Sequence, residues 1–350
     1  RHNGPFCLTD CTRPVKPAAK RGQHVVIAWK GLPLYATSAI SAAVKAGRRH
    51  IRVIASKPET PAAGVEDVIG TRVHWIAADS CQTFDQLGLD VPDVLFVAGW
   101  SVPSFMRLAK EVRRAGGAVV CMADNSFRGD VRQCVGAIVY RIAYNRLFHS
   151  VWVPGRSGTK LMRWFGVPSD RIYQGLYTGD TAHFRVTRSL ADRPLRFTFG
   201  GQFIDRKNVR RMCRAFLRFQ AESSADGILE LYGAGPLRGS LPDHPAIRIH
   251  DFSSPERLAA AFNTSRCLIL PSILDHWGVV VHEAAACGML LIVSDATGAA
   301  CDLCGPDNSR IIHALNEDDL VAALHWAATL DRDSLMRGSQ QSLTLSAQYS

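Results

Sequence analysis

Short apolar runs alternate with amphipathic stretches along almost the whole chain. The runs predict strands and the stretches predict helices. Many of the runs are apolar throughout, as expected for strands that are covered on both faces. In the first half they lie at His24–Ala28, Ile51–Ala55, Arg72–Ala77, Asp93–Ala98, Gly117–Met122 and Val151–Val153. In the second half they lie at Arg196–Gly200, Ile228–Tyr232, Ala246–His250, Arg266–Pro271, Met289–Val293 and Ser309–His313.

The stretches between these runs have helical periodicity. After Asn208, which can cap a helix, apolar side chains recur on one helix face and arginines fill the other. Strands that alternate with helices predict parallel sheets with right-handed crossovers. Two such series predict an α/β chain of two Rossmann-like, doubly wound domains facing across a cleft. The expected segments are a flexible tail at 1–20, an N-terminal domain at 21–184, a polar linker at 185–194 and a C-terminal domain at 195–350.

Composition places the chain among globular proteins. Its 350 residues suffice for two domains, and 47% hydrophobic and 21% charged residues are ordinary values. No run approaches the roughly 18 apolar residues that cross a bilayer, and residues 1–20 lack the apolar core of a secretory signal. Only Cys7/Cys11 and Cys301/Cys304 are close in sequence among ten cysteines. Structural thiols in a reducing cytoplasm are therefore favoured over a zinc site.

The net charge of +10 favours anionic partners. No nucleic-acid motif accompanies the scattered arginines, so two interpretations remain: a generally basic surface, or a face for an anionic membrane. The stretch Val131–Phe148 interleaves apolar residues with Arg132, Arg141 and Arg146. We expect a core helix with arginines that extend to solvent, and a helix resting on an anionic membrane is the alternative.

The strongest chemical signal lies between Pro271 and Gly288. A strand is followed by a loop with Asp275 and Trp277, and a helix begins near Gly278. Free N–H groups at the helix start, including Val279, form an anion site, and Gly278 lets a diphosphate approach closely. Further along this helix, Glu283 can accept from vicinal hydroxyls such as those of a ribose. The alternative is a plain strand–loop–helix with two solvated acids.

A second signal is the segment Phe199–Asn208. A strand ends at Gly200 and Gly201, and the cations Arg206 and Lys207 precede a helix. Such cations would stabilise the charge of a departing diphosphate. A solvated basic pair is the alternative interpretation.

Weaker signals follow two other strands. Gly233-Ala234-Gly235-Pro236 is a glycine-rich turn, but it lacks a complete dinucleotide fingerprint. A nicotinamide oxidoreductase is therefore a remote alternative. Gly31 follows the first strand, where it would face a diphosphate or simply form a turn.

The Pro271–Gly288 segment resembles the retaining, family-4-type glycosyltransferases of the GT-B fold. Their frame, P-S-x-x-E-x-F-G…E-A-x-A-x-G, is reproduced except that Trp277 replaces Phe and Asp275 replaces the first Glu. The resemblance implies a sugar contact for Asp275, ribose binding for Glu283 and a phosphate contact for Lys207, with Gln202 where many members have Arg. It further implies a nucleotide-flanking turn at Gly233 and Gly235 and a base cradle around Phe252. Asp124 matches a residue near the reacting centre; a helix cap is the alternative.

The resemblance implies a retaining enzyme that moves sugar from a nucleoside-diphosphate donor to a hydroxyl acceptor. Metal ions and cofactors are not expected, because Arg206, Lys207 and the N–H groups near Gly278 supply positive charge. We expect a cytoplasmic protein, at the inner membrane face if its acceptor is lipid-linked, in bacterial polysaccharide or glycolipid assembly. A catalytically inactive nucleotide-sugar-binding protein is the alternative. Family members carry a helix beyond Ser342–Ser350 that returns to the first domain, so a short crossover or a fragment is expected here.

Overall fold

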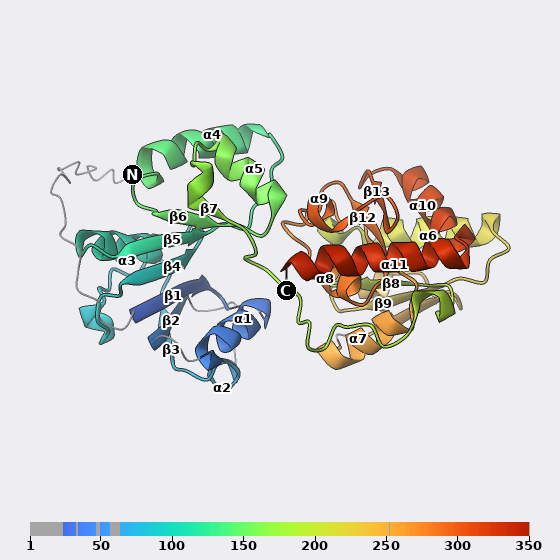
Figure 1. The fold of residues 1–350 in the computed structure, drawn as a ribbon, viewed down its shortest axis with the longest axis horizontal. Coiled ribbons are helices and arrows are strands. Elements are labelled where there is room, and N and C mark those ends of the chain that lie inside the picture. Colours follow the sequence, from blue (N-terminus) through green and yellow to red (C-terminus); the bar gives the residue numbers. More distant parts are fainter. Residues whose placement is uncertain (1–23, 33, 47–49, 57–63, 252, 350) are drawn as a thin grey trace. The chain divides into compact units, whose positions relative to one another are not determined.

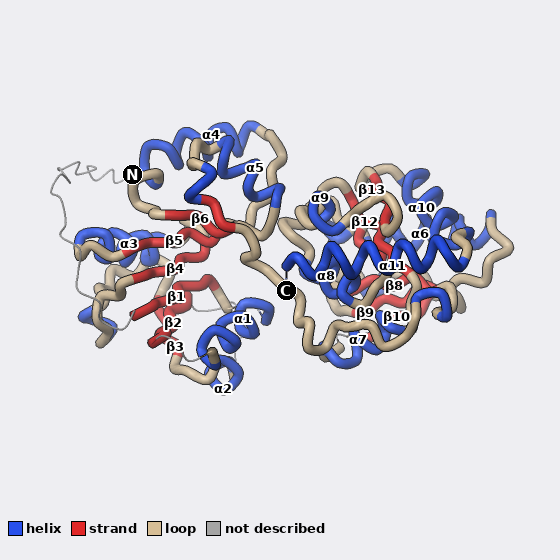
Figure 2. The backbone as a smooth tube through the Cα atoms, viewed as in Figure 1, coloured by secondary structure: helices blue, strands red, loops and turns tan. Residues whose placement is uncertain are grey.

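The computed structural model describes residues 24–32, 34–46, 50–56, 64–251 and 253–349, which form two parallel sheets with helices around them (Figures 1 and 2). The first sheet has the order β3-β2-β1-β4-β5-β6-β7. Its strands are β1 (His24–Lys30), β2 (His50–Ser56), β3 (Val73–Ile76), β4 (Val94–Ala98), β5 (Ala118–Met122), β6 (Ser150–Trp152) and β7 (Ile172–Tyr173). The accompanying helices are α1 (Leu34–Lys45), α2 (Val65–Ile69), α3 (Pro103–Arg114), α4 (Val131–Val139) and α5 (Arg156–Trp164).

The second sheet has the order β10-β9-β8-β11-β12-β13. Its strands are β8 (Arg196–Gly200), β9 (Ile228–Tyr232), β10 (Ile247–His250), β11 (Cys267–Leu270), β12 (Leu290–Ser294) and β13 (Ser309–Ile312). The accompanying helices are α6 (Val209–Glu222), α7 (Pro255–Asn263), α8 (Val279–Ala286), α9 (Ala300–Leu303), α10 (Glu317–Thr329) and α11 (Arg332–Ser346). Every residue of β11 and β12 is buried, as expected for strands with helices on both faces.

The order of strands in the second sheet indicates where a ligand would bind. The chain winds outward from β8 to β10, then returns and winds the other way from β11 to β13. The strand order therefore reverses between β8 and β11, which are paired in parallel through Cys267 and Phe197. In doubly wound sheets, ligands bind at the carboxyl ends of the strands at this reversal. A ligand is therefore expected at the loops after β8 and β11.

The predicted fold class is confirmed, and each of the twelve expected strands is present within a residue or two of its expected limits. The sequence interpretation missed β7, whose two residues are too short to form a recognisable apolar run. The described residues divide into two compact units: those up to Cys121 with Leu147–His149, and Met122–Arg146 with those from Ser150 onward. The expected domain limits, with a linker at 185–194, remain a prediction.

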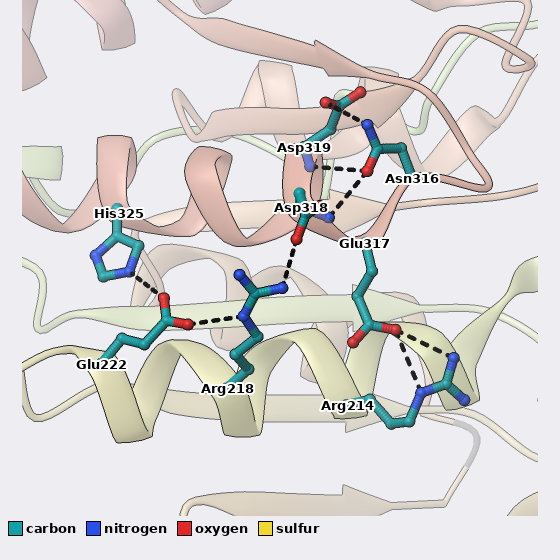
Figure 3. A network of polar contacts seen from close by, with 8 residues as sticks. All are labelled: Arg214, Arg218, Glu222, Asn316, Glu317, Asp318, Asp319 and His325. Atoms are coloured by element: carbon teal, nitrogen blue, oxygen red, sulfur yellow. Dashed lines mark hydrogen bonds and ion pairs between the residues drawn. The ribbon is translucent and has the colours of Figure 1, made fainter.

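Helices α6 and α10 lie side by side and are joined at their surfaces by ion pairs (Figure 3). The side chain of Asn316 caps α10 by accepting from the N–H groups of Asp318 and Asp319. The rings of Phe216 and Phe219 on α6 each pack edge to face against the ring of Phe197 in β8. The surface network consists of Arg214, Arg218, Glu222, Glu317, Asp318 and His325.

Two local predictions need correction. Asn208 precedes α6, but its φ of 59° is left-handed and its side chain makes no cap hydrogen bond, because a capping side chain needs an extended backbone. Its amide donates instead to the carbonyls of Pro271 (3.2 Å) and Ala314 (2.7 Å). The stretch Val131–Phe148 is helical only to Tyr144, where α4 ends in a π-helical turn (Tyr140–Tyr144). Although Tyr140 is buried, Ile138 and Ile142 are exposed, so the expectation of a core helix is wrong for that face.

Candidate active site

The loops after β8 and β11 meet through a buried ion pair. Lys207, at the end of a 3-10 turn after β8, donates from Nζ to Oδ2 of Asp275 in the loop after β11. Each of these side chains is only 12% exposed. The structure thus joins the strongest signals of the sequence, 68 residues apart, at the reversal point of the sheet.

Backbone hydrogen bonds hold both partners in place. The N–H of Ile273 donates to the carbonyl of Arg206 at 2.8 Å, and Nη1 of Arg206 donates to the carbonyl of Leu274 at 3.2 Å. Asp275 forms a β-bridge with Thr297. The backbone of Asp275 is therefore fixed by this bridge and its carboxylate is held by Lys207, while the Arg206 side chain is exposed. Exposure leaves the charge of Arg206 accessible to a ligand.

The helix that follows this loop begins in the predicted way. Gly278 precedes α8 with a φ of 84°, a left-handed conformation that glycine adopts without strain. A Cβ atom there would lie 3.1 Å from both Leu270 and Thr297. The backbone strain and the crowding thus explain why a glycine precedes α8, which starts at Val279. The free N–H groups of this first helical turn are of the kind that binds anions.

Glu283 lies on α8 against the segment that precedes the second sheet. A Cβ atom on Gly179 would lie 2.9 Å from Cγ of Glu283, so only glycine allows this approach. Burial raises the pKa of Glu283 to about 7, and the nearby Asp180 carboxylate adds to the increase. The group is thus divided between charged and neutral forms at neutral pH. A ligand hydroxyl donating to it would favour the charged form.

His282, which the sequence interpretation overlooked, connects three segments at this site. Its Nδ1 accepts from the N–H of Gly179 at 2.6 Å, and its Nε2 donates to the carbonyl of Ser346 at 3.0 Å. These partners fix a neutral tautomer, and burial lowers the pKa of His282. The segment around Gly179, α8 and the end of α11 are therefore held together beside Glu283. A lone histidine in a helix carries no sequence signal for such a role.

A second overlooked group surrounds Trp277. The carboxylate of Asp302 accepts from the Tyr349 hydroxyl at 2.6 Å and from Nε of Arg156 at 3.0 Å. The Tyr349 ring lies 5.3 Å from that of Trp277. Because Asp302 and Arg156 are 146 residues apart, no local pattern could have predicted this contact.

The loop from Ser272 to Trp277 also contains polar atoms without partners. Ser272 Oγ, His276 Nδ1 and Trp277 Nε1 are buried with no hydrogen-bond partner among the described residues. Each such group costs about 1–3 kcal/mol. Buried polar groups are usually satisfied, so three exceptions in six residues mark this loop as unusual.

The glycine turns after β8 and β9 contact each other. A Cβ atom on Gly233 would lie 1.9 Å from the carbonyl oxygen of Gly201, and one on Gly235 would lie 2.5 Å from that of Phe203. Phe203 also donates its N–H to the carbonyl of Ala234 at 2.8 Å. These glycines are therefore required for loop-to-loop packing, whatever they contribute to a ligand.

The structure describes two of the three remaining candidates. The Tyr177 hydroxyl donates to Asp124 at 3.2 Å. Because Asp130 caps α4, the interpretation of Asp124 as a helix cap is wrong. Gly31 follows β1 in the first unit with a φ of 68°. Phe252 lies outside the described residues.

No group of three His, Cys, Asp or Glu side chains that could hold a metal ion occurs in the part of the chain that the structure describes. Within those same residues, no helix is long and apolar enough to cross a bilayer.

The fold is shared with glycosyltransferases of known structure. The glycosyltransferase from Rickettsia africae ESF-5 superposes with a TM-score of 0.71 at 10% identity, over 94% of both chains. Anabaena Alr3699/HepE, solved in complex with UDP, gives 0.72 at 12% identity, over 93% of this chain and 95% of its own. Sucrose-phosphate synthase from Thermosynechococcus elongatus gives 0.65 at 15% identity, over 93% and 94%. The chain therefore has the two-sheet GT-B fold of glycosyltransferases.

The sequence around the second sheet is similar to glycosyltransferases as well. Residues 182–340 match the family model described as glycosyl transferases group 1. This stretch, which contains Lys207, Asp275 and Glu283, is similar to the group 1 glycosyltransferases, in agreement with the resemblance seen in the sequence. No curated protein sequence matches the chain.

Proposed function

We propose that the protein transfers a sugar from a nucleoside-diphosphate donor to a hydroxyl acceptor, with retention of configuration and without a metal ion. The observation that carries this proposal is the buried Lys207–Asp275 ion pair at the reversal point of the second sheet. A cation for a diphosphate and a carboxylate for sugar hydroxyls are there in direct contact. A donor would come between them and bind both.

The surrounding residues suit the parts of such a donor. The N-terminus of α8 and the exposed Arg206 guanidinium provide positive charge for a diphosphate. Glu283 on α8 provides a carboxylate for ribose hydroxyls. Because burial raises its pKa, hydrogen bonds from those hydroxyls would stabilise its charged form. Trp277 Nε1 and Ser272 Oγ, buried without partners, would gain hydrogen bonds from a ligand that reached them.

Retention follows from attack on the same face as departure. The bond from the anomeric carbon to the diphosphate oxygen breaks, and a bond from that carbon to the acceptor oxygen forms. The acceptor's proton passes to the departing phosphate oxygen. Lys207 and Arg206 stabilise the charge that develops on that oxygen, which is the contribution that lowers the barrier. Asp124, fixed by Tyr177, is proposed to contact the acceptor or the reacting sugar.

The test is a titration of the purified protein with a panel of UDP-, GDP- and ADP-sugars, followed by assays of sugar release and transfer. We expect one donor to bind and to be turned over. Binding without release or transfer would favour the alternative of a catalytically inactive nucleotide-sugar-binding protein. No binding by a folded sample would contradict the proposal. Titration with NAD and NADP in parallel tests the oxidoreductase alternative.

We also propose that the acceptor is lipid-linked, as in bacterial polysaccharide or glycolipid assembly, and that the protein works from the cytoplasm at the inner membrane face. The support is the net charge of +10 and the apolar face of α4.

A further inference from the structure

Helix α4 and the π-helical turn after it expose a continuous apolar stripe. Five large aliphatic side chains along this single element face solvent. Their exposed fractions are 79% for Val131, 57% for Val135, 59% for Ile138, 44% for Val139 and 83% for Ile142. Their spacing is that of one helix face. We call these five residues the α4 stripe.

The opposite face of the same helix is already packed. Ala137 and Tyr140 are buried, and the Tyr140 ring lies 5.7 Å from that of Phe165, which follows α5. Gly136 also faces the Phe165 ring, since a Cβ atom there would lie 3.3 Å from it. Helix α4 therefore packs against the end of α5 (Figure 1), and the five residues of its stripe, on the opposite side of the helix, are exposed.

The stripe differs from the other exposed apolar residues that the structure describes. Those residues, such as Val68, Tyr173, Ile311 and Met336, lie on separate elements. Single exposed apolar side chains are normal on a soluble protein, whereas a contiguous group indicates a binding surface.

Basic residues border the stripe. At about 100° per residue, Arg132 and Arg141 fall on its two edges, and Arg146 follows the π-helical turn. The residues 122–165 contain seven Arg or Lys and two Asp, a net charge of 7 − 2 = +5.

We propose that the α4 stripe docks on the surface of an anionic lipid bilayer. The aliphatic side chains would enter the boundary between headgroups and acyl chains, and the bordering arginines would contact lipid phosphates. A second copy of this chain is a poorer occupant, because a two-fold contact would bring Arg132 and Arg141, at the edges of the stripe, close to the same arginines of the other copy. The partner is thus membrane lipid of negative charge. This inference deepens the proposed location at the membrane face; it involves neither Lys207 nor Asp275 and does not depend on sugar transfer.

The test is co-sedimentation of the full chain with vesicles, without any donor. Vesicles of phosphatidylglycerol and phosphatidylcholine should pull down the protein at low salt, and vesicles of phosphatidylcholine alone should bind it much more weakly. The triple variant Val135→Ser/Ile138→Ser/Ile142→Ser should lose most of the binding, since each buried aliphatic side chain contributes on the order of tenfold. Because these side chains are exposed, the variant should keep the wild-type melting temperature.

Two matched variants separate the contributions. Ile311→Ser/Leu315→Ser/Met336→Ser removes exposed apolar residues elsewhere and should leave binding unchanged. Arg132→Gln/Arg146→Gln should weaken binding about fivefold per charge and reduce its salt dependence. Arg141 is left intact because it donates to the carbonyls of Trp164 and Phe165.

Three results would overturn the proposal. The first is no binding to anionic vesicles at low salt. The second is equal binding by the α4 stripe variant and by the wild type. The third is a wild-type dimer in light scattering that the stripe variant abolishes, which would assign the surface to a second copy. Each result leaves the donor titration untouched, so the two proposals fail separately.

Discussion

At the scale of single residues, the Lys207–Asp275 pair yields the most direct prediction. Lys207→Ala should reduce kcat more than it weakens donor affinity, because the cation matters most when the diphosphate departs. The variant should also lose about 1–3 kcal/mol of stability, since the Asp275 carboxylate remains buried without its partner. Steady-state kinetics and urea unfolding measure the two effects. An increase in KM with kcat intact would indicate ground-state binding instead.

Lys207→Ala/Asp275→Asn provides the matching control for stability. If the loss in the single variant comes from the uncompensated carboxylate, the double variant should recover part of it. Activity should not recover, because both groups are proposed to contact the donor.

Glu283 predicts a pH dependence of donor binding. Its pKa of about 7 means that the carboxylate gains a proton as the pH falls through neutrality. Ribose hydroxyls favour the charged form, so donor affinity should decrease as the pH falls from 8 to 6. In Glu283→Gln this part of the dependence should vanish, and affinity at pH 8 should be lower by roughly 1–3 kcal/mol. Calorimetric titration across this range measures both, and an unchanged profile in the variant would contradict the assignment.

The same shift has a consequence for stability. Because burial raises this pKa from 4.5, the folded protein holds the proton more tightly than the unfolded chain between about pH 4.5 and 7. The contribution of Glu283 to stability therefore falls as the pH rises through that window. Glu283→Gln should be more stable than the wild type at pH 8 and should lose that advantage near pH 4. Thermal melts at the two pH values test the sign.

At the scale of elements, the expected linker is firmly attached at its end. The Arg193 side chain is fully buried, and the acceptors that the structure describes for it are oxygens of uncharged groups, including the carbonyls of Arg188, Phe262 and Cys287. Burial lowers the pKa of this guanidinium to about 10. Arg193 therefore fastens the segment before β8 to α7 and to the end of α8.

Arg193→Lys should be strongly destabilising although it keeps the charge. An ammonium group cannot reach carbonyls in so many directions, and each buried acceptor left unpaired costs about 1–3 kcal/mol. We expect a loss of roughly 2–4 kcal/mol in urea unfolding. The exposed Arg210→Lys serves as control and should change stability little. Similar behaviour of the two variants would show that Arg193 does not anchor this segment.

Elements also show what the sequence can predict. Buried parallel strands are continuous apolar runs, so β11 and β12 are evident from composition alone. The α4 stripe was misjudged because aliphatic residues in a helix are normally core residues, and only the packing of Tyr140 against Phe165 shows which face is covered. The contacts of His282 and Asp302 depend on partners far along the chain. Such contacts leave no local pattern.

At the scale of the whole molecule, the order of strands in the second sheet explains why two separate motifs form one candidate site. Lys207 and Asp275 follow different strands, and neither motif by itself indicates that the two residues meet. The winding order makes β8 and β11 neighbours, so the loops at their carboxyl ends converge. The sheet topology, which follows from the alternation of strands and helices, thus brings the two motifs together at one site.

The turns after β8 and β9 pack so closely that they restrict which amino acids can replace their glycines. A methyl group on Gly233 would overlap the carbonyl of Gly201, and neither backbone can retreat without moving its strand. Gly233→Ala should cost at least about 1–3 kcal/mol, whereas Gly239→Ala, with open space around it, should be nearly neutral. In a mutational scan that measures the yield of folded protein, every substitution of Gly233 should therefore lower the yield. Variants with a new donor preference should therefore keep the glycines of both turns and carry their substitutions at other positions.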